Sequence, residues 1–298
     1  MDLQEHEIEG KIRFELPEGR FPEAVFENEH GRGRMSLYGG HLLELHFESD
    51  GPIFWLSPQA IYREGTAIRG GVPLVFPWFG SHPTDGALPS HGFARISDWT
   101  LVRTEASDHE VSLTLGLVDT EDTRAMWPHS FQAHMTTTLS DQGFEQKLVL
   151  TNTGTADWTW AGGFHPYFAI GNLGSTRVRG LEEVPFINLL DGQRECEPGS
   201  ITFGEETDRA YTTSPEELRI LDTSNNREFV LEIRGSDSTV VWNPGIGKSK
   251  ADMSSEGPDK FVCVEPARAA HLKTWSERSS LAPGEKTELV YQVNIRHF

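Results

Sequence analysis

The most regular feature of the chain is an alternation of apolar and polar residues with a period of two. It is clear at Ile12, Phe14 and Leu16, which alternate with Arg13 and Glu15, and it returns in residues 111–117, 131–139, 144–150, 229–233 and 289–295. Such alternation is typical of strands with one buried face. Turn-forming residues at 140–143 and 282–285 separate some of these runs. The pattern predicts an all-β protein.

Helical periodicity is scarce. The best candidates are residues 121–127 and a short turn after Ser214, where Pro215 could occupy the first helical position. No linker-like composition divides the chain, and no period of about 20 to 50 residues repeats. We therefore predict one domain over residues 1–298, a large two-sheet antiparallel β-sandwich with few short helices.

The composition indicates a large buried core and a strongly negative charge. Hydrophobic residues make up 37% of the chain, with 8 Trp and 17 Phe, which is enough apolar material for a large buried core. The formal net charge is −19, from 26 basic and 45 acidic residues. That charge would repel nucleic acid and anionic membranes, so we expect neither as a partner. A solvated acidic surface is the simplest interpretation.

Two cysteines, Cys196 and Cys263, are too few for a disulfide framework, and we expect two reduced, buried thiols. The first residues lack the positive flank and apolar stretch of a signal peptide, and no run of about 18 apolar residues occurs. We predict a soluble, cytoplasmic protein and a monomer.

Three segments do not look like ordinary strands. Residues 68–80 and 88–95 are dense in Gly, Pro and aromatic residues around a few polar groups, and residues 162–168 place His165 among aromatics after a glycine pair. This composition suits irregular segments that line a pocket, and the glycine pair permits close approach of backbones.

His165 and Glu265 are candidates for acid–base chemistry. A partly desolvated imidazole can exchange a proton near neutral pH, although a lone histidine is more often structural. Glu265 ends the apolar run 261–264, and alternation places it on the same face as Phe261 and Cys263. A buried carboxylate there must be paired or raised in pKa, as a general base requires, and a salt bridge to Arg268 is the competing interpretation.

Other polar and aromatic residues suggest a ligand. Arg69 and Arg95 flank the irregular segments, and a guanidinium suits phosphate or carboxylate oxygens, although each alone could be a surface arginine. Trp78, Phe79 or Trp242 could offer a flat face to a sugar ring, and buried tryptophan is the commoner alternative.

Common cofactor and nucleophile motifs are missing from the sequence: it contains no HExxH, CxxC pair, Walker loop, GxSxG or GxGxxG after a strand. The 12 histidines show no metal-ligand spacing. We therefore expect chemistry without a metal or any other cofactor.

Several ordered motifs, from about residue 35 to the C-terminus, together resemble the D-hexose-6-phosphate mutarotases, or glucose-6-phosphate 1-epimerases, of the galactose mutarotase-like group. They are Arg-Gly-Gly-Val-Pro-Leu-Val-Phe-Pro-Trp-Phe-Gly, Leu-Pro-Ser-His-Gly-Phe-Ala-Arg, Phe-His-Pro-Tyr-Phe, Glu-Thr-Asp-Arg-Ala-Tyr, Val-Val-Trp-Asn-Pro and Cys-Val-Glu-Pro-Ala. The resemblance implies a large two-sheet β-sandwich, in agreement with the strand pattern, and a hexose phosphate as the small-molecule substrate.

The resemblance also implies roles for individual residues. His165 and Glu265 fall at the catalytic positions, and the implied substrate-binding residues are Arg69, Ser90, His91, Arg95 and Asp208. The position of Ser90 is often glutamine in relatives, and a water could bridge the shorter hydroxyl to the sugar.

The mechanism that follows is ring opening and reclosure. Glu265 removes the proton of the anomeric hydroxyl while His165 protonates the ring oxygen, and reversal after rotation about C1–C2 gives the other anomer. This requires an ionised Glu265 and a protonated His165 at the start. The alternatives are a mutarotase of unphosphorylated aldoses and a non-catalytic carbohydrate-binding sandwich. A glycosidase, which normally uses two carboxylates, fits less well.

Overall fold

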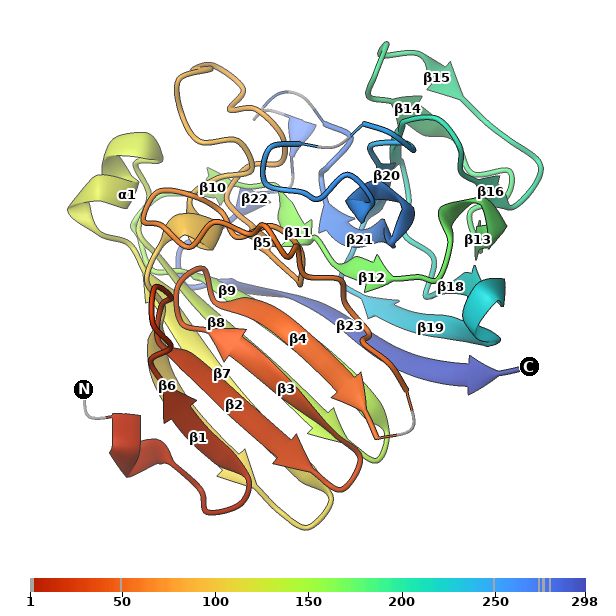
Figure 1. Cartoon of the computed structure of the whole chain (residues 1–298). Helices are drawn as coiled ribbons and strands as arrows, with labels where there is room; N and C mark the ends of the chain where they lie inside the picture. Colours follow the sequence, from red (N-terminus) through yellow and green to blue (C-terminus); the bar gives the residue numbers. More distant parts are fainter. Residues whose placement is uncertain (1–2, 49, 249, 273, 275–276, 279) are drawn as a thin grey trace.

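The computed structural model of the chain describes residues 3–48, 50–248, 250–272, 274, 277–278 and 280–298, and its regular secondary structure is mostly antiparallel strands (Figure 1). Its largest sheet has nine strands. Their order is β16 (Ile201–Thr202), β13 (Thr176–Arg179), β18 (Glu217–Asp222), β19 (Arg227–Arg234), β23 (Lys286–His297), β9 (Gly143–Asn152), β8 (Phe131–Ser140), β7 (Glu110–Val118) and β6 (Thr100–Ala106). This sheet forms one layer of the sandwich.

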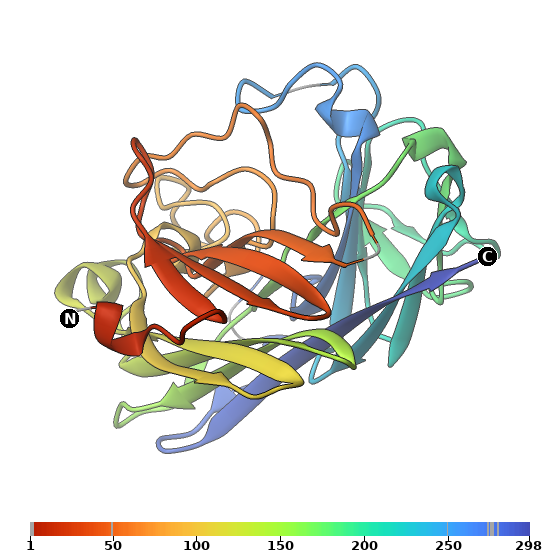
Figure 2. The ribbon, with the colours of Figure 1, turned by 60° about the horizontal axis from the view of Figure 1, so that its bottom comes forward.

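Two sheets make up the opposite layer. The smaller one has the strands β1 (Ile12–Glu15), β2 (Glu23–Asn28), β3 (Gly31–Ser36) and β4 (His41–Phe47). Figure 2 shows it lying over the part of the nine-stranded sheet that contains β6 to β9. Thr137 on β8 donates a hydrogen bond to the sulfur of Met35 on β3, which joins the layers in the interior.

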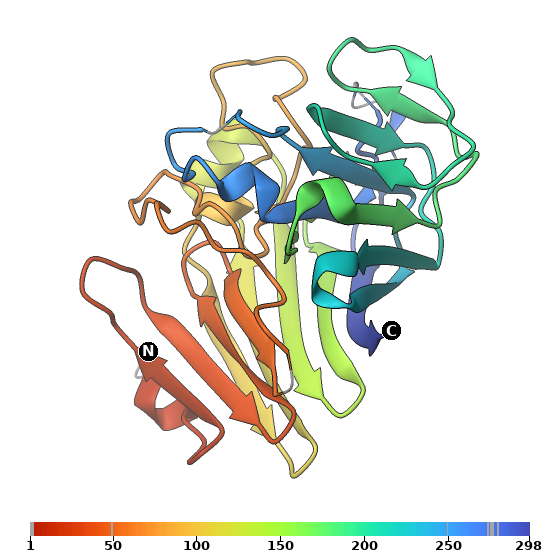
Figure 3. The ribbon, with the colours of Figure 1, turned by 45° about the vertical axis from the view of Figure 1, so that its right-hand side comes forward.

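The second sheet of that layer has eight strands. Their order is β15 (Arg194–Glu195), β14 (Phe186–Asn188), β17 (Thr207–Tyr211), β20 (Ser238–Asn243), β21 (Phe261–Arg268), β11 (Gly162–Phe164) and β5 (Leu74–Val75), and β12 (Tyr167–Ala169) also pairs with β21. The β14–β15 hairpin forms the outer edge, at the end of the molecule far from the N-terminus (Figure 3). A two-stranded ribbon of β10 (Trp158–Thr159) and β22 (Ser280–Leu281) completes the strands.

The fold confirms the predicted all-β sandwich, with the refinement that one layer is divided into two sheets. The strands predicted from alternation are present as β1, β7, β8, β9, β19 and β23, and the predicted buried run at 261–264 lies in β21. The prediction is wrong for Leu16, which lies beyond the end of β1 and is 73% exposed. Residues 140–143 form the predicted tight turn, because Ser140 pairs with Gly143 across the β8–β9 hairpin. The inward residues of these strands form one hydrophobic cluster that runs from Ile12 to Val293.

Helix is limited, among the described residues, to α1 (Glu121–Met126) and the short 3-10 turns η1 (Leu3–His6), η2 (Ala94–Ile96), η3 (Leu173–Ser175), η4 (Thr223–Asn225) and η5 (Gly257–Asp259). The helix predicted at 121–127 is confirmed, and Thr120 and Thr123 cap it reciprocally. The turn predicted after Ser214 is wrong. Residues 212–216 are not helical, and the backbone carbonyl of Glu216 accepts a hydrogen bond from Ile233 on β19, so the chain runs directly into β18.

The described part of the chain contains no helix long and apolar enough to cross a membrane. Cys196 and Cys263 are both free, as predicted, and Cys263 is buried. Cys196, however, is exposed, because it follows the short edge strand β15. The prediction of a second buried thiol is therefore wrong.

Candidate active site

One face of the eight-stranded sheet carries Glu265 and Asp208, two of the polar residues singled out in the sequence. Strand β21 is buried on both faces: Val262 and Val264 point into the main core, whereas Phe261 and Cys263 belong to a second hydrophobic cluster. Glu265 follows Cys263 by two residues and therefore points to the same side as the second cluster. The alternation predicted for this strand is confirmed.

Strand register brings the neighbouring residues to that face. Asp208 on β17 pairs with Trp242 on β20, and Trp242 pairs with Cys263. Val240, two residues before Trp242, pairs with Glu265. Directly paired residues of antiparallel strands point to the same side of a sheet. Asp208, Trp242 and Glu265 therefore share one face.

His165 lies opposite Glu265 because of how two short strands pair with β21. Gly163 on β11 pairs with Ala267, and Tyr167 on β12 pairs with Cys263. The residue midway between Gly163 and Tyr167 is His165, and the residue midway between their partners is Glu265. The glycine is necessary here, because a Cβ at Gly163 would overlap the backbone of β21. The predicted role of the glycine pair in close backbone approach is confirmed.

The irregular segments close the opposite side of the site. Arg69, Phe79, Ser90, His91 and Arg95 line a pocket of about 350 Å³. The other lining residues are Gly80, His165, Leu189, Asp208, Val240, Trp242, Lys250 and Glu265. This volume lies within the range of about 300–1,000 Å³ that is usual for small-molecule sites. All seven site residues predicted from the sequence therefore come together.

The His165–Glu265 pair is nearly sealed from solvent. Nδ1 of His165 lies 3.4 Å from Oε1 of Glu265, with 8% and 1% of the two side chains exposed. Neither His165 Nδ1 nor Glu265 Oε2 has a hydrogen-bond partner, although both atoms are buried. Buried polar atoms usually have partners, so these are the atoms that a polar ligand would satisfy. The competing salt bridge from Glu265 to Arg268 does not form, because Arg268 bonds Thr287 and lies beside Asp237.

Burial sets the protonation of this pair. Burial raises the pKa of Glu265 well above its ordinary value. The negative charge of nearby Asp208 adds to this rise, whereas the positive charge of Arg95 opposes it. Burial also lowers the pKa of His165 well below its ordinary value, and the positive charges of Arg95 and Arg69 add to that effect. Both shifts favour the neutral forms of the two groups in the free protein, whereas the mechanism inferred from the sequence starts from the ionic pair. The two forms differ only by transfer of one proton between the groups.

His91 is positioned as a neutral hydrogen-bond donor. Its Nδ1 accepts a hydrogen bond from the backbone N–H of Gly80 at 3.3 Å, which leaves the ring proton on Nε2. Burial lowers the pKa of His91 well below its ordinary value, as do Arg95 and His165. Its ring lies 5.8 Å from that of His165.

The three cations of the pocket differ in how they are held. Arg69 donates hydrogen bonds to Asp252 and to the hydroxyl of Tyr167, each at 2.9 Å. Arg95 donates to the backbone carbonyl of Ser90 at 2.7 Å, and burial lowers the pKa of Arg95 to about 10. Lys250 lies over the ring of Trp242, with Nζ 5.3 Å from its centroid. Arg69 thus already has a carboxylate partner, whereas Arg95 and Lys250 are available to an anion.

Asp208 and Ser90 are less buried than the His165–Glu265 pair. Burial raises the pKa of Asp208 to about 6, and Glu206 contributes to that rise. Ser90 is exposed, and its backbone carbonyl rather than its hydroxyl contacts Arg95. Trp78, in contrast, is fully buried and donates its indole N–H to the carbonyl of Pro89. The suggestion that Trp78 faces a sugar is wrong, whereas Phe79 and Trp242 do line the pocket.

Lys250, Tyr167 and Asp252 are site residues that the sequence analysis missed. The available signal was the pair of lysines at 248 and 250, just after Val-Val-Trp-Asn-Pro in an acidic protein. Their placement depends on a long loop between β20 and β21 that has no periodicity. One buried group of potential metal ligands also lies here: His165, Cys263 and Glu265 have ligand atoms within 4.8 Å of one another. The three neighbouring cations disfavour a metal ion at this position.

Comparisons with known proteins agree with this architecture. The two-layer antiparallel sandwich is shared with a crystal structure of a putative mutarotase from Salmonella typhimurium, at a TM-score of 0.88 and 27% identity over 98% of this chain and 96% of that one. It is also shared with a galactose 1-epimerase from Lactobacillus acidophilus NCFM, at a TM-score of 0.74 and 14% identity over 96% and 99% of the two chains. The fold is thus the one found in this class of protein, the mutarotases.

Sequence similarity places the chain within that class. The model of the aldose 1-epimerase family matches residues 24–294. A protein of Escherichia coli K12 named "Putative glucose-6-phosphate 1-epimerase" is 34% identical over 255 residues, which cover 84% of each chain. One of Cenchrus ciliaris with the same name is 31% identical over 262 residues, 84% of this chain and 77% of its own. The chain belongs to the aldose 1-epimerase family.

Proposed function

We propose that the protein is a hexose-6-phosphate mutarotase that interconverts the α and β anomers of its substrate, with glucose 6-phosphate as the expected hexose phosphate. The observation that carries the proposal is the His165–Glu265 pair, 3.4 Å apart at the base of a pocket that also holds Arg69, Arg95 and Lys250. An acid–base pair suits ring opening, and the cations suit a phosphate. The names of the E. coli and Cenchrus relatives give the same activity.

The first catalytic step moves two protons. The carboxylate of Glu265 takes the proton of the anomeric hydroxyl while the imidazolium of His165 gives a proton to the ring oxygen. The bond between C1 and the ring oxygen breaks, and an open-chain aldehyde forms. Glu265 and His165 are then both neutral, which is the form that burial favours in the free protein. After rotation about C1–C2, the reverse transfers close the ring on the other face.

The phosphate of the substrate promotes the protonation of His165 that this step requires. In the free protein, Arg95 and Arg69 disfavour a positive charge on His165. A phosphate bound by Arg95 and Lys250 offsets their charge and raises the pKa of His165, so that the proton of the pair moves to the imidazole. Phosphate binding and catalytic protonation are coupled in this scheme.

The remaining residues hold the sugar. His91 donates from Nε2 to the ring oxygen or to a hydroxyl, and Asp208 accepts from sugar hydroxyls. Phe79 and Trp242 give the ring an apolar wall. The exposed Ser90 reaches the sugar through a water.

We also propose that the chain acts as one domain over residues 1–298, as a monomer in the cytoplasm. A hydrophobic cluster that runs from the first to the last strand supports the single domain. Free Cys196 and Cys263 suit a reducing compartment.

Anomer-exchange NMR tests the function. Exchange spectra of glucose 6-phosphate, galactose 6-phosphate and glucose are recorded with catalytic amounts of protein. We expect acceleration for the hexose phosphates and much weaker acceleration for glucose. Equal acceleration of glucose would identify a general aldose mutarotase, and binding without acceleration of any sugar would identify a non-catalytic sandwich.

A further inference from the structure

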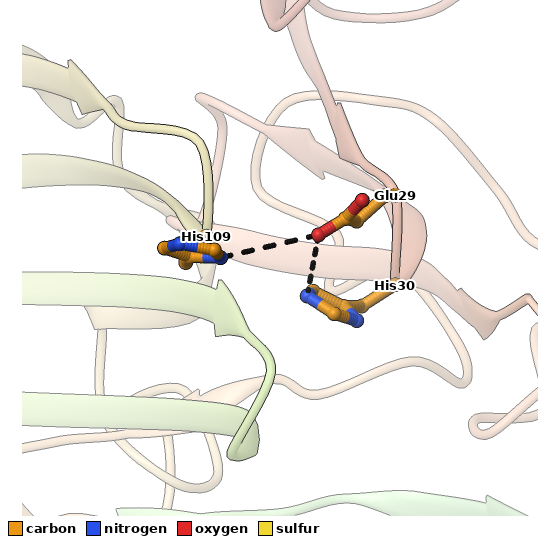
Figure 4. Close-up of side chains that lie close together, drawn as sticks. All are labelled: Glu29, His30 and His109. Atoms are coloured by element: carbon orange, nitrogen blue, oxygen red, sulfur yellow. Dashed lines mark ion pairs between the residues drawn. The ribbon is translucent and has the colours of Figure 1, made fainter.

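A second group of potential metal ligands lies at the surface, where two hairpin turns meet (Figure 4). Glu29 and His30 occupy the turn between β2 and β3, and His109 occupies the turn between β6 and β7. Oε1 of Glu29 lies 3.4 Å from Nε2 of His30 and 3.9 Å from Nδ1 of His109. One ligand atom of each residue lies within 4.8 Å of the other two.

These spacings suit an ion held between the residues better than direct hydrogen bonds. Both distances exceed the usual hydrogen-bond range of about 2.7–3.2 Å. Ligand atoms at about 2.0–2.2 Å from a tetrahedral zinc ion lie on the order of 3.3–3.5 Å from one another. The two imidazoles must close by at most about 1.5 Å to reach that geometry. His109, with 74% of its side chain exposed, is free to rotate by that amount.

His30 provides an independent sign of a missing ligand. Its Nε2 atom is out of contact with solvent and has no hydrogen-bond partner, and it points toward the carboxylate of Glu29 (Figure 4). A solvent-excluded ring nitrogen normally has a partner. A cation between the three side chains would provide one.

Both turns are held in place by side-chain hydrogen bonds. Oδ1 of Asn28 accepts from the backbone N–H groups of His30 and Gly31, and its Nδ2 donates to the carbonyl of Leu139 on β8. Oγ of Ser107 accepts from the backbone N–H of His109. The ligands are therefore presented by fixed backbones, which reduces the entropy lost when an ion binds.

The surroundings attract cations. Glu29 also lines a neighbouring groove of about 560 Å³, to which Glu27, Glu48 and Asp50 contribute carboxylates and Lys11 and Arg32 contribute positive charge. With four carboxylates against two cations, and with a net charge of −19 over the chain, the local field favours a divalent ion.

We propose that Glu29, His30 and His109 form a surface site for Zn²⁺, with water as the fourth ligand. Two imidazoles and one carboxylate suit zinc, whereas Mg²⁺ and Ca²⁺ prefer oxygen ligands alone. The ion would join the four-stranded sheet to the edge of the nine-stranded sheet and stabilise the sandwich. The proposal is independent of the function assigned to the pocket.

Titration calorimetry of the metal-free, full-length protein with ZnCl₂ tests the site, together with the change in Tm on addition of Zn²⁺. The test variant is His30→Ala/His109→Ala, and the control is His129→Ala/His134→Ala, which removes two imidazoles that lie outside the site and its groove. Loss of direct ligands should weaken binding by at least the roughly tenfold that loss of an outer-shell partner causes. The variant should also lose the zinc-dependent rise in Tm, which the control keeps.

A second variant keeps the test informative if the double variant misfolds. His109→Ala alone removes one highly exposed side chain and should still weaken zinc binding, with unchanged circular dichroism and unchanged anomer exchange. Equal zinc affinity in wild type and both variants would overturn the proposal. So would zinc binding that inhibits anomer exchange and persists in the double variant, because the ion would then lie at His165, Cys263 and Glu265.

Discussion

The imidazole of His165 lies parallel to the phenol ring of Tyr167, with ring centroids 4.9 Å apart and an interplanar angle of 7°. The Tyr167 hydroxyl in turn accepts a hydrogen bond from Arg69 at 2.9 Å. The tyrosine therefore fixes the orientation of the candidate acid–base group and connects it to a cation of the pocket. Through Tyr167, the residues that transfer protons are in contact with the end of the pocket that faces an anion.

Removal of either member of the proton-transferring pair should abolish most of the activity. We expect Glu265→Gln and His165→Asn each to slow anomer exchange of glucose 6-phosphate by about 10²- to 10⁴-fold. Exchange NMR measures the rates, and circular dichroism checks the fold. His129→Asn, which changes a half-buried histidine outside the pocket, is the control. Near wild-type exchange in either folded pocket variant would remove the assigned roles.

The charge of Arg95 should control the pKa of His165. Because a nearby positive charge disfavours an imidazolium, Arg95→Met should raise the pKa of His165, and so should bound inorganic phosphate in the wild type. NMR titration of the His165 ring nitrogens measures both shifts. In kinetic terms, the pH at which His165 loses its proton should be higher for glucose 6-phosphate than for glucose. An unchanged or lowered pKa of His165 in both experiments would contradict the coupling.

Lys250 should contribute to phosphate recognition, and Lys248 should not. Hydrogen bonds to charged groups contribute about 1.5–3 kcal/mol, so Lys250→Ala should raise KM for glucose 6-phosphate about tenfold or more without a matching effect on glucose. Lys248 is the matched control on the same loop, because it pairs with Glu206 at 3.1 Å outside the pocket lining. Arg95→Ala should behave like Lys250→Ala. Equal effects of the two lysine variants would argue against the assignment.

His41 should make the stability of the fold depend on pH. It is fully buried, its Nε2 bonds the carbonyl of Gly70 at 2.7 Å, and burial lowers the pKa of His41 from 6.5 to about 4. Unfolding between these values takes up a proton, so stability falls as pH drops from 6.5 to 4, by about 3 kcal/mol from this group. Urea unfolding at pH 7 and pH 5 should show a smaller loss for His41→Gln than for wild type. Identical losses of stability in the two proteins would show that other groups dominate the pH dependence.

The buried pair of Arg227 and Asp222 should matter far more for stability than a surface pair. The Arg227 guanidinium lies 3.2 Å from the Asp222 carboxylate, and both side chains are buried. Removing one partner leaves a buried charge, so Arg227→Met should lower the free energy of unfolding by about 3–5 kcal/mol. Arg219→Met, which breaks part-exposed pairs of a residue on neighbouring β18, should lower it far less. Chemical denaturation of both variants makes the comparison.

Local patterns were sufficient to predict seven of the described strands, most of them long. Alternation at 131–139 and 144–150 reports which side of each strand is buried, and it requires no knowledge of the partner strand. The same argument placed Glu265 on the face of Cys263. A local signal failed at the turn after Ser214. Pro215 predicted a helical turn there, but the backbone at Glu216 pairs with Ile233 on β19 instead.

Only the tertiary structure decided how these faces combine. His165 and Glu265 are a hundred residues apart, and they meet because β11 and β12 both pair with β21 around a glycine. Burial raises the pKa of Glu265, and burial together with Arg95 and Arg69 lowers the pKa of His165. Local periodicity predicts neither the meeting of the two residues nor the shifts in their pKa values. Strand register, loop placement and desolvation are non-local, so the sequence determined the sandwich and its candidate residues, and the fold determined their geometry and charge.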